Sequence, residues 1–337
     1  MFCTSLWLSR WLSRRRKVAA SISVWVCWSI VCRISLVAAK KPVYSHRGHY
    51  SIRRVQLLLW YDRPIRRDLL KFEHFGQGSP TLVFSHANGF PPATYRRLFQ
   101  AWGGAVDAPL LKPLTTTVDE AASDTWWRMA EELADWLESQ PESRLLAGHS
   151  MGAVVSCLAA MRCPEKVAGL MMLDPVFLPT RWLAPMRLMP KRFKVKQPLV
   201  AKTLRRPHQF DDHRGAFRFH RSKRVFSGLD DQALTDYIHA AFEPNEQGVA
   251  LRYSREWEAH IYQTAPWIWP RLRRLKVPTL VIRGGNSDTV TPASWARIGR
   301  LCPEAERIEL PECGHLLPME KPREVAALMR GWVAHRS

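Results

Sequence analysis

The pentapeptide Gly148-His149-Ser150-Met151-Gly152 constrains this chain most, because of the sequence on either side of it. An apolar run over residues 144–147 predicts a strand before it, and residues 153–162 predict a helix after it. A serine at such a strand-to-helix turn takes a strained backbone conformation, and small flanking residues let the strand and helix pass closely. The turn exposes the Ser150 hydroxyl beside the first amides of the helix, so the pattern predicts a nucleophilic serine.

A serine hydroxyl is a weak nucleophile and needs an imidazole base that a carboxylate holds in one tautomer. Residues 277–283 predict a buried strand that runs into a loop with Asp288, and a strand at 306–310 leads to a loop with His315. Loops that follow parallel strands meet at one edge of the sheet. We therefore expect Ser150, Asp288 and His315 to form a catalytic triad in that chain order.

Attack by a serine on a carbonyl also requires donors for the developing oxyanion. Residues 80–85 predict another buried strand, which ends in the loop 86–90. In this arrangement one donor comes from that loop and the other from the residue after the nucleophile. We expect the backbone N–H groups of Asn88 and Met151 to serve, with Ala87 as the alternative to Asn88.

Four motifs in order carry a resemblance to a known family. They are S-H-A-N-G-F at 85–90, G-H-S-M-G at 148–152, D-T-V-T-P at 288–292 and Gly314-His315. From about residue 55 to its end the chain resembles serine-nucleophile α/β-hydrolases, in particular bacterial esterase/lipase-like hydrolases with the first two strings. The resemblance implies the α/β-hydrolase fold, a mostly parallel sheet flanked by helices with a helical lid insertion. The family usually has His-Gly where this chain has His-Ala.

Some reactive residues have alternative interpretations. Asp174 follows a predicted strand at 166–173 and is the alternative acid; we prefer Asp288 because the resemblance puts the acid one strand later. We expect His149 to pack beside the serine rather than act as base. We expect His86 to be a structural hydrogen-bonding group behind the oxyanion loop.

Length and composition limit the other options. At 337 residues with 46% apolar residues, the chain can bury one large α/β core plus an insertion. Its seven cysteines show no framework spacing, and no Cys/His ligand cluster or phosphate-binding glycine loop occurs. We expect no metal and no cofactor.

The formal net charge of +20 is concentrated in two segments. Residues 1–54 hold 11 Lys/Arg and no acidic residue, and residues 181–227 carry a net +12. The rest of the chain is therefore slightly acidic, at −3. The basic segments lie apart from the predicted catalytic residues.

Residues 1–54 form a basic leader whose role has three interpretations. The basic residues 14–17 precede an apolar run over 18–39 that Arg33 interrupts. This pattern fits a membrane anchor, a cleaved signal or a dispensable leader. We expect a cytoplasmic location, with anchoring or export through residues 14–39 as the alternatives.

The remaining chain divides into a core and a lid. We expect the hydrolase core at 55–175 and 269–337, and a helical basic and aromatic lid at 176–268. Prolines interrupt the first half of the lid, whereas residues 230–242 and 254–262 have helical apolar spacing.

A lid with an aromatic inner face and a cationic outer face suits an acyl chain or an aromatic ester. Its outer face is also a candidate contact for an anionic membrane surface. No recognition motif accompanies the basic and aromatic residues at 217–226, so we expect no nucleic-acid partner. The candidates for the aromatic inner face are Trp182, Phe217, Phe226, Trp257, Trp267 and Trp269.

These patterns favour a serine hydrolase that acts on a small-molecule carboxylic ester or acyl substrate, esterase/lipase-like, through an acyl-enzyme. The same triad would also serve amide, thioester or carbon–carbon hydrolysis, or a cofactor-free perhydrolase. An interpretation of another class is a basic membrane-surface or nucleic-acid-binding module with a vestigial site. The sequence determines neither the acyl length nor the oligomeric state.

Overall fold

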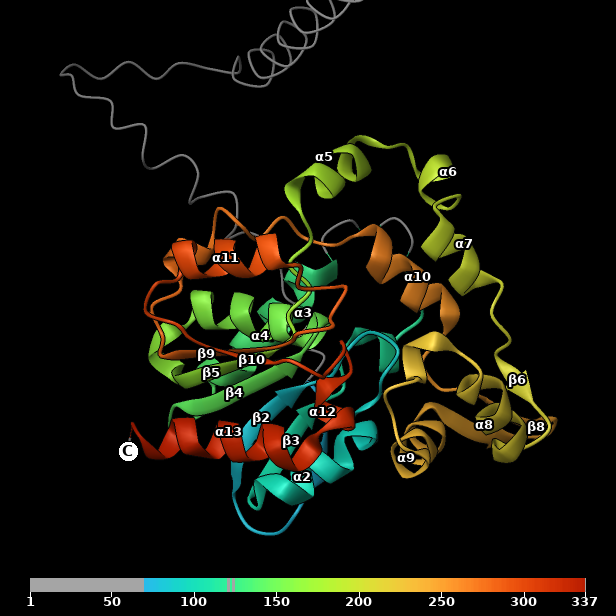
Figure 1. Ribbon diagram of the computed structural model, residues 1–337, viewed down its shortest axis with the longest axis horizontal. Helices are drawn as coiled ribbons and strands as arrows, with labels where there is room; N and C mark the ends of the chain where they lie inside the picture. The colour runs from blue at the N-terminus through green and yellow to red at the C-terminus, as the bar shows by residue number, and fades with distance from the viewer. Residues whose placement is uncertain (1–69, 120–121, 123–124, 337) are drawn as a thin grey trace, which may run out of the picture. The chain divides into compact units, whose positions relative to one another are not determined.

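A seven-stranded sheet forms the centre of the described chain (Figure 1). Its strand order is β1-β3-β2-β4-β5-β9-β10, and all neighbours run parallel except β1 and β3. A parallel sheet needs helices on both faces, and the predicted α/β-hydrolase fold is confirmed. The strands are β1 (Phe72–Phe75), β2 (Pro80–Ser85), β3 (Ala105–Pro109), β4 (Arg144–His149), β5 (Val167–Leu173), β9 (Thr279–Gly284) and β10 (Glu306–Leu310).

The computed structural model describes residues 70–119, 122 and 125–336. Contacts divide the chain into units at 1–66 and 67–337, and every described residue belongs to the second. The predicted leader, with its three interpretations, lies outside the described residues. None of the described helices is long and apolar enough to cross a bilayer.

Helices cover both faces of the sheet, and alternate strand residues supply both hydrophobic layers. In β5, Leu170 and Met172 pack in the layer of α3 and α4, whereas Met171 and Leu173 pack in the layer of α2 and α13. This alternation follows from the two-residue period of a strand. The helices of the core are α2 (Arg96–Trp102), α3 (Thr125–Glu138), α4 (Met151–Arg162), α11 (Pro292–Leu301), α12 (Leu317–Glu320) and α13 (Pro322–Ala334).

The insertion between β5 and β9 is mainly helical, and we use the name lid for this segment. Side-chain caps begin three of its helices: Asp212 accepts from the backbone N–H of Gly215, Asp230 from Ala233, and Ser254 from Trp257. Its helices are α5 (Thr180–Leu188), α6 (Lys191–Lys194), α7 (Pro198–Leu204), α8 (His213–Arg221), α9 (Asp231–Ala241) and α10 (Arg255–Gln263).

The insertion also contains a three-stranded antiparallel sheet in the order β6-β8-β7, which the helical prediction does not include. The strands are too short for a clear alternating pattern. They are β6 (Gln209–Phe210), β7 (Phe242–Asn245) and β8 (Gly248–Leu251). Short 3-10 turns complete the described elements: η3 (Pro92–Tyr95), η4 (Lys112–Leu114), η5 (Pro164–Lys166), η6 (Arg224–Phe226) and η7 (Leu272–Arg274).

The parallel strands all end at one edge of the sheet. There the chain continues into the loops that hold Asn88, Ser150, Asp174, Asp288 and His315. The topology therefore places the predicted reactive residues around one region.

Candidate active site

Ser150 occupies the sharp turn between β4 and α4. Its backbone has φ 55° and ψ −112°, a region that costs a non-glycine residue about 1–3 kcal/mol. A side chain at Gly152 would overlap the carbonyl oxygen of Ser85, so only glycine lets α4 pass β2 this closely. The surrounding fold holds the strained turn, because the Ser150 N–H donates to the carbonyl of Leu173 over 3.0 Å.

His315 joins this serine to a carboxylate. Its Nε2 lies 3.0 Å from Ser150 Oγ, and its Nδ1 lies 2.7 Å from Asp174 Oδ2. A carboxylate accepts hydrogen bonds, so Nδ1 carries the proton and donates it to Asp174. The lone pair of Nε2 then faces the serine hydroxyl, which is the arrangement a general base requires.

The expectation that Asp288 orients His315 is wrong. Asp288 is exposed, and the hydroxyl of Thr289 donates to its Oδ1 over 3.4 Å. Asp174, the alternative acid, is fully buried and makes the contact instead. The physical reason is the path of the loop after β9, which turns Ser287 rather than Asp288 toward the Asp174 carboxylate.

Ser287 is a residue of this site that the sequence interpretation missed. Its hydroxyl donates to Asp174 Oδ2 over 2.5 Å, and the backbone N–H of Gly284 donates to Oδ1 over 3.0 Å. The Ser287 oxygen in turn accepts from the backbone N–H groups of Thr289 and Val290. With His315, three donors therefore fix the Asp174 carboxylate. A serine in a loop after a strand carries no signal that would single it out.

The loop after β2 forms a tight turn in which Gly89, at φ 78°, takes the left-handed conformation. The N–H of Phe90 donates to the carbonyl of Ala87, which closes the turn. The N–H of Ala87 donates to the hydroxyl of Tyr95 over 3.1 Å, so this amide is already used. No backbone hydrogen bond from the N–H groups of Asn88 and Met151 occurs within the described chain.

The lid holds the side chain of Asn88 at both ends. The hydroxyl of Tyr253 donates to Asn88 Oδ1 over 2.7 Å, and Asn88 Nδ2 donates to the carbonyl of Glu258 over 3.2 Å. The Glu258 carboxylate pairs with Arg206, whose Nη2 lies 2.5 Å from Oε2. The start of α10 thus fixes the oxyanion loop.

His149 links the loops on the two sides of Ser150. Its Nε2 donates to the carbonyl of His315 over 2.8 Å, so its Nδ1 accepts from the hydroxyl of Tyr95 over 2.9 Å. Burial, together with the neighbouring His315, lowers the pKa of His149 well below the ordinary value. A neutral imidazole with both nitrogens engaged is a structural group, not a base.

His86 is also buried. Its Nδ1 donates to the carbonyl of Ala87 over 2.9 Å, and burial lowers its pKa to about 4. The ring thus supports the oxyanion loop from behind and stays neutral near pH 7.

The lid aromatic residues divide into two sets. Phe226, Trp257 and Trp269 are buried and Phe217 is half-buried. Trp182 and Trp267 are 52% and 40% exposed, so the predicted aromatic inner face is wrong for these two.

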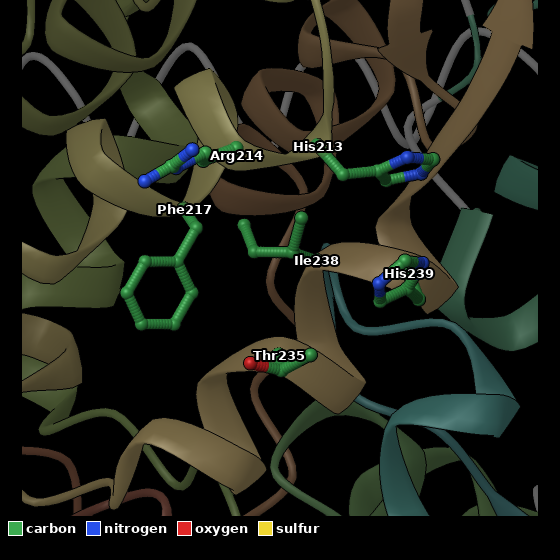
Figure 2. Close-up of a pocket in the computed structure, with 6 residues that line it drawn as sticks. All are labelled: His213, Arg214, Phe217, Thr235, Ile238 and His239. Carbon is green, nitrogen blue, oxygen red and sulfur yellow. The ribbon is translucent and has the colours of Figure 1, made fainter.

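A separate cavity of about 370 Å³ lies between α8 and α9 of the lid (Figure 2). The rings of His213 and His239 stack at its edge with centroids 4.4 Å apart. None of the residues around Ser150 contributes to it. No group of three or more metal-ligating side chains occurs among the residues that the structure describes. The cavity is lined by His213, Arg214, Phe217, Thr235, Ile238 and His239.

Comparison with known proteins agrees with the fold. The Alpha/beta hydrolase family matches residues 74–328. A mouse protein, sn-1-specific diacylglycerol lipase ABHD11, is 24% identical over 196 residues, which are 56% of this chain and 59% of the mouse protein. The chain thus spans less than two thirds of the length of that relative.

Solved structures share the fold at low sequence identity. An E-2-(acetamidomethylene)succinate hydrolase is 19% identical, with a TM-score of 0.65 over 81% of this chain and 98% of its own. An esterase of Mycobacterium tuberculosis, Rv0045c, is 18% identical, with a TM-score of 0.61 over 79% of this chain and 92% of its own.

Proposed function

Because this chain belongs to the alpha/beta hydrolase family, we propose that it hydrolyses carboxylic esters through an acyl-enzyme formed on Ser150. The observation that carries the proposal is the continuous hydrogen-bonded chain from Ser150 Oγ through His315 to Asp174. The mouse diacylglycerol lipase, an ester hydrolase by its name, supports an ester as the substrate class.

In the first step, Ser150 Oγ attacks the ester carbonyl while His315 Nε2 takes the hydroxyl proton. Asp174 accepts from Nδ1 and stabilises the imidazolium that forms. The carbonyl oxygen becomes an oxyanion that accepts from the N–H groups of Asn88 and Met151. Each such donor contributes about 3–4 kcal/mol in comparable sites. His315 then gives its proton to the leaving alcohol, and the acyl group stays on Ser150.

In the second step, His315 takes a proton from water, and the resulting hydroxide attacks the acyl carbonyl. The same two amides hold the second oxyanion. Its collapse breaks the bond to Ser150 Oγ and releases a carboxylic acid, while His315 returns the proton to the serine.

The test combines active-site labelling with turnover. A fluorophosphonate should label the wild type, and the wild type should hydrolyse p-nitrophenyl esters, whereas Ser150→Ala should do neither. Circular dichroism should show both proteins folded. Labelling or turnover that persists in Ser150→Ala would exclude this serine.

A panel of matched ester, amide, thioester and diketone substrates then tests the bond. A preference for the esters would support the proposal. Labelling at Ser150 together with turnover of only the amides, thioesters or diketones would keep the nucleophile and overturn the ester. Failure of both labelling and turnover would favour a vestigial site.

A further inference from the structure

The first three helices of the lid expose most of the large apolar side chains that the described chain leaves in solvent. Figure 1 shows α5, α6 and α7 following one another along the outer side of the lid. Five of the seven exposed large hydrophobic residues among the described ones lie in these helices or in the turn between α6 and α7. We call their surface the arm surface: Trp182, Leu188, Phe193, Val195 and Leu199.

These side chains do not pack in the core. Other residues of α5 and α7 make the contacts with the core. Leu183 of α5 is 1% exposed, and Val200 and Thr203 of α7 are also buried. Leu188, in contrast, is 87% exposed. A single exposed apolar side chain is ordinary, but a concentration of five large ones in one short segment commonly marks an interaction site.

The same segment is strongly cationic. Residues 181–205 hold eight Lys/Arg and no Asp or Glu. Arg181 lies over the ring of Trp182 at 5.7 Å, and Arg192 over the ring of Phe193 at 5.0 Å. Apolar anchors beside cations, without acids, are typical of helices that lie in a membrane interface.

We propose that the arm surface binds anionic phospholipid bilayers. Trp182, Phe193 and Leu199 would enter the boundary between headgroups and acyl chains, and the Lys/Arg side chains would contact the phosphates. A nucleic acid would use the charges, but it would leave side chains such as that of Leu188 in solvent. Binding requires none of the groups around Ser150, so it holds or fails independently of ester hydrolysis.

Hydrogen–deuterium exchange of the full chain tests this surface locally, whatever residues outside the described range contribute. The probes are vesicles of phosphatidylcholine alone and of phosphatidylcholine with phosphatidylglycerol. Peptides over 181–199 should exchange more slowly with the anionic vesicles only, and high salt should reverse the effect. Peptides of α13 should not change.

Charge reversal supplies the matched control. Arg181→Glu with Arg192→Glu and Lys196→Glu should weaken vesicle binding by about 100-fold or more, since each basic residue near an anionic surface is worth about fivefold. The control set Arg300→Glu, Lys321→Glu and Arg323→Glu makes the same net change on exposed residues of the core, and should weaken binding much less.

The apolar anchors are tested separately by the triple variant Trp182→Ser, Leu188→Ser and Leu199→Ser, which should lower affinity even at low salt. Three outcomes would overturn the proposal. One is unchanged exchange over 181–199 while the chain sediments with vesicles. Another is an equal loss of binding in the two charge-reversal sets. The third is slowing that depends on protein concentration without vesicles, which would assign the surface to a second copy of this chain.

Discussion

At the scale of single residues, His315 is held through both its ring and its backbone. Its ring contacts Ser150 and Asp174, while its backbone carbonyl accepts from His149. Asp174 itself sits at φ 44°, a conformation uncommon for aspartate outside special turns. Two strained residues, Ser150 and Asp174, thus face one histidine, so the geometry for proton transfer is built into the backbone.

The first prediction compares the two aspartates. Asp174→Asn should lower kcat for p-nitrophenyl acetate by about 10³–10⁴-fold, because an amide favours the wrong tautomer of His315. Asp288→Asn is the matched control and should stay within about twofold of the wild type, because its side chain is exposed. Equal losses in the two variants, or a loss confined to Asp288→Asn, would contradict the geometry.

The second prediction concerns Tyr95, whose hydroxyl accepts from the N–H of Ala87 and donates to His149. Tyr95→Phe would leave both buried groups without a partner, at about 1–3 kcal/mol for each. Urea unfolding should therefore show a large loss of stability. Tyr262→Phe, whose hydroxyl donates to Glu258 over 3.2 Å, removes the same atom elsewhere and should cost less. A Tyr95→Phe variant as stable as the wild type would show that this hydrogen-bond chain is not needed.

At the scale of elements, α10 connects the lid to the oxyanion loop. The carbonyl of Glu258 holds Asn88, and its carboxylate is held by Arg206 and the hydroxyl of Tyr262. Glu258 is 6% exposed, so removing a partner would leave a buried carboxylate without its hydrogen bonds. The position of the Asn88 amide thus depends on an ion pair within the lid.

The third prediction therefore removes one partner. Arg206→Ala should destabilise the protein by about 2–3 kcal/mol, below the full value for a buried pair because the Arg206 side chain is 24% exposed. The kcat should also fall, because an uncompensated Glu258 carboxylate would shift α10, and the Glu258 carbonyl holds Asn88. Arg206→Met combined with Glu258→Gln removes both charges and should recover most of the stability in urea unfolding. If the double variant were less stable than Arg206→Ala, the ion pair would not be the cause.

The elements differ in how far the sequence predicts them. The apolar runs of β2 and β10 predict Pro80–Ser85 and Glu306–Leu310, and the structure has the same bounds. The sequence pattern predicts neither β1 nor β3. In β3, Asp107 interrupts the run and pairs with His74 of β1 over 2.9 Å. This pairing joins residues that are far apart in the sequence, so the pattern of neighbouring residues does not reveal it.

The site shows the same division. The turn at Ser150 can be predicted from local spacing, because the close approach of the flanking strand and helix requires glycine at positions 148 and 152. The choice between Asp174 and Asp288 does not, since both follow strand ends and differ only in how their loops fold. Ser287 donates to Asp174 and not to Asp288, and this contact depends on the tertiary structure.

At the scale of the whole molecule, burial of histidines couples stability to pH. Burial lowers the pKa of His86 and of His220 to about 4, and that of His149 well below its ordinary value of 6.5. In the unfolded chain all three take up protons near pH 6.5. The unfolded state therefore binds more protons below that pH, and acid favours unfolding.

The fourth prediction follows from this sign. The free energy of unfolding should be nearly constant between about pH 7 and 8 and fall between pH 6.5 and 4, by up to about 1.4 kcal/mol per pH unit for each histidine. The lowered pKa values of Asp230 and Glu256 keep those carboxylates ionised over the upper part of this range. Urea unfolding at several pH values between 8 and 4.5 measures the slope.

His220→Phe isolates one histidine from the other two. The His220 ring lies among Phe210, Phe226 and Phe242, and its Nε2 is buried without a hydrogen-bond partner within the described chain. A phenyl ring fills this place and binds no proton, but it gives up the hydrogen bond from His220 Nδ1 to the carbonyl of Ala216 over 2.7 Å. The variant should therefore lose about 1 kcal/mol of stability at pH 8 and about a third of the slope below pH 6.5, so that its stability relative to the wild type rises as the pH falls. Identical slopes in the two proteins would show that His220 takes up its proton equally well in the folded state.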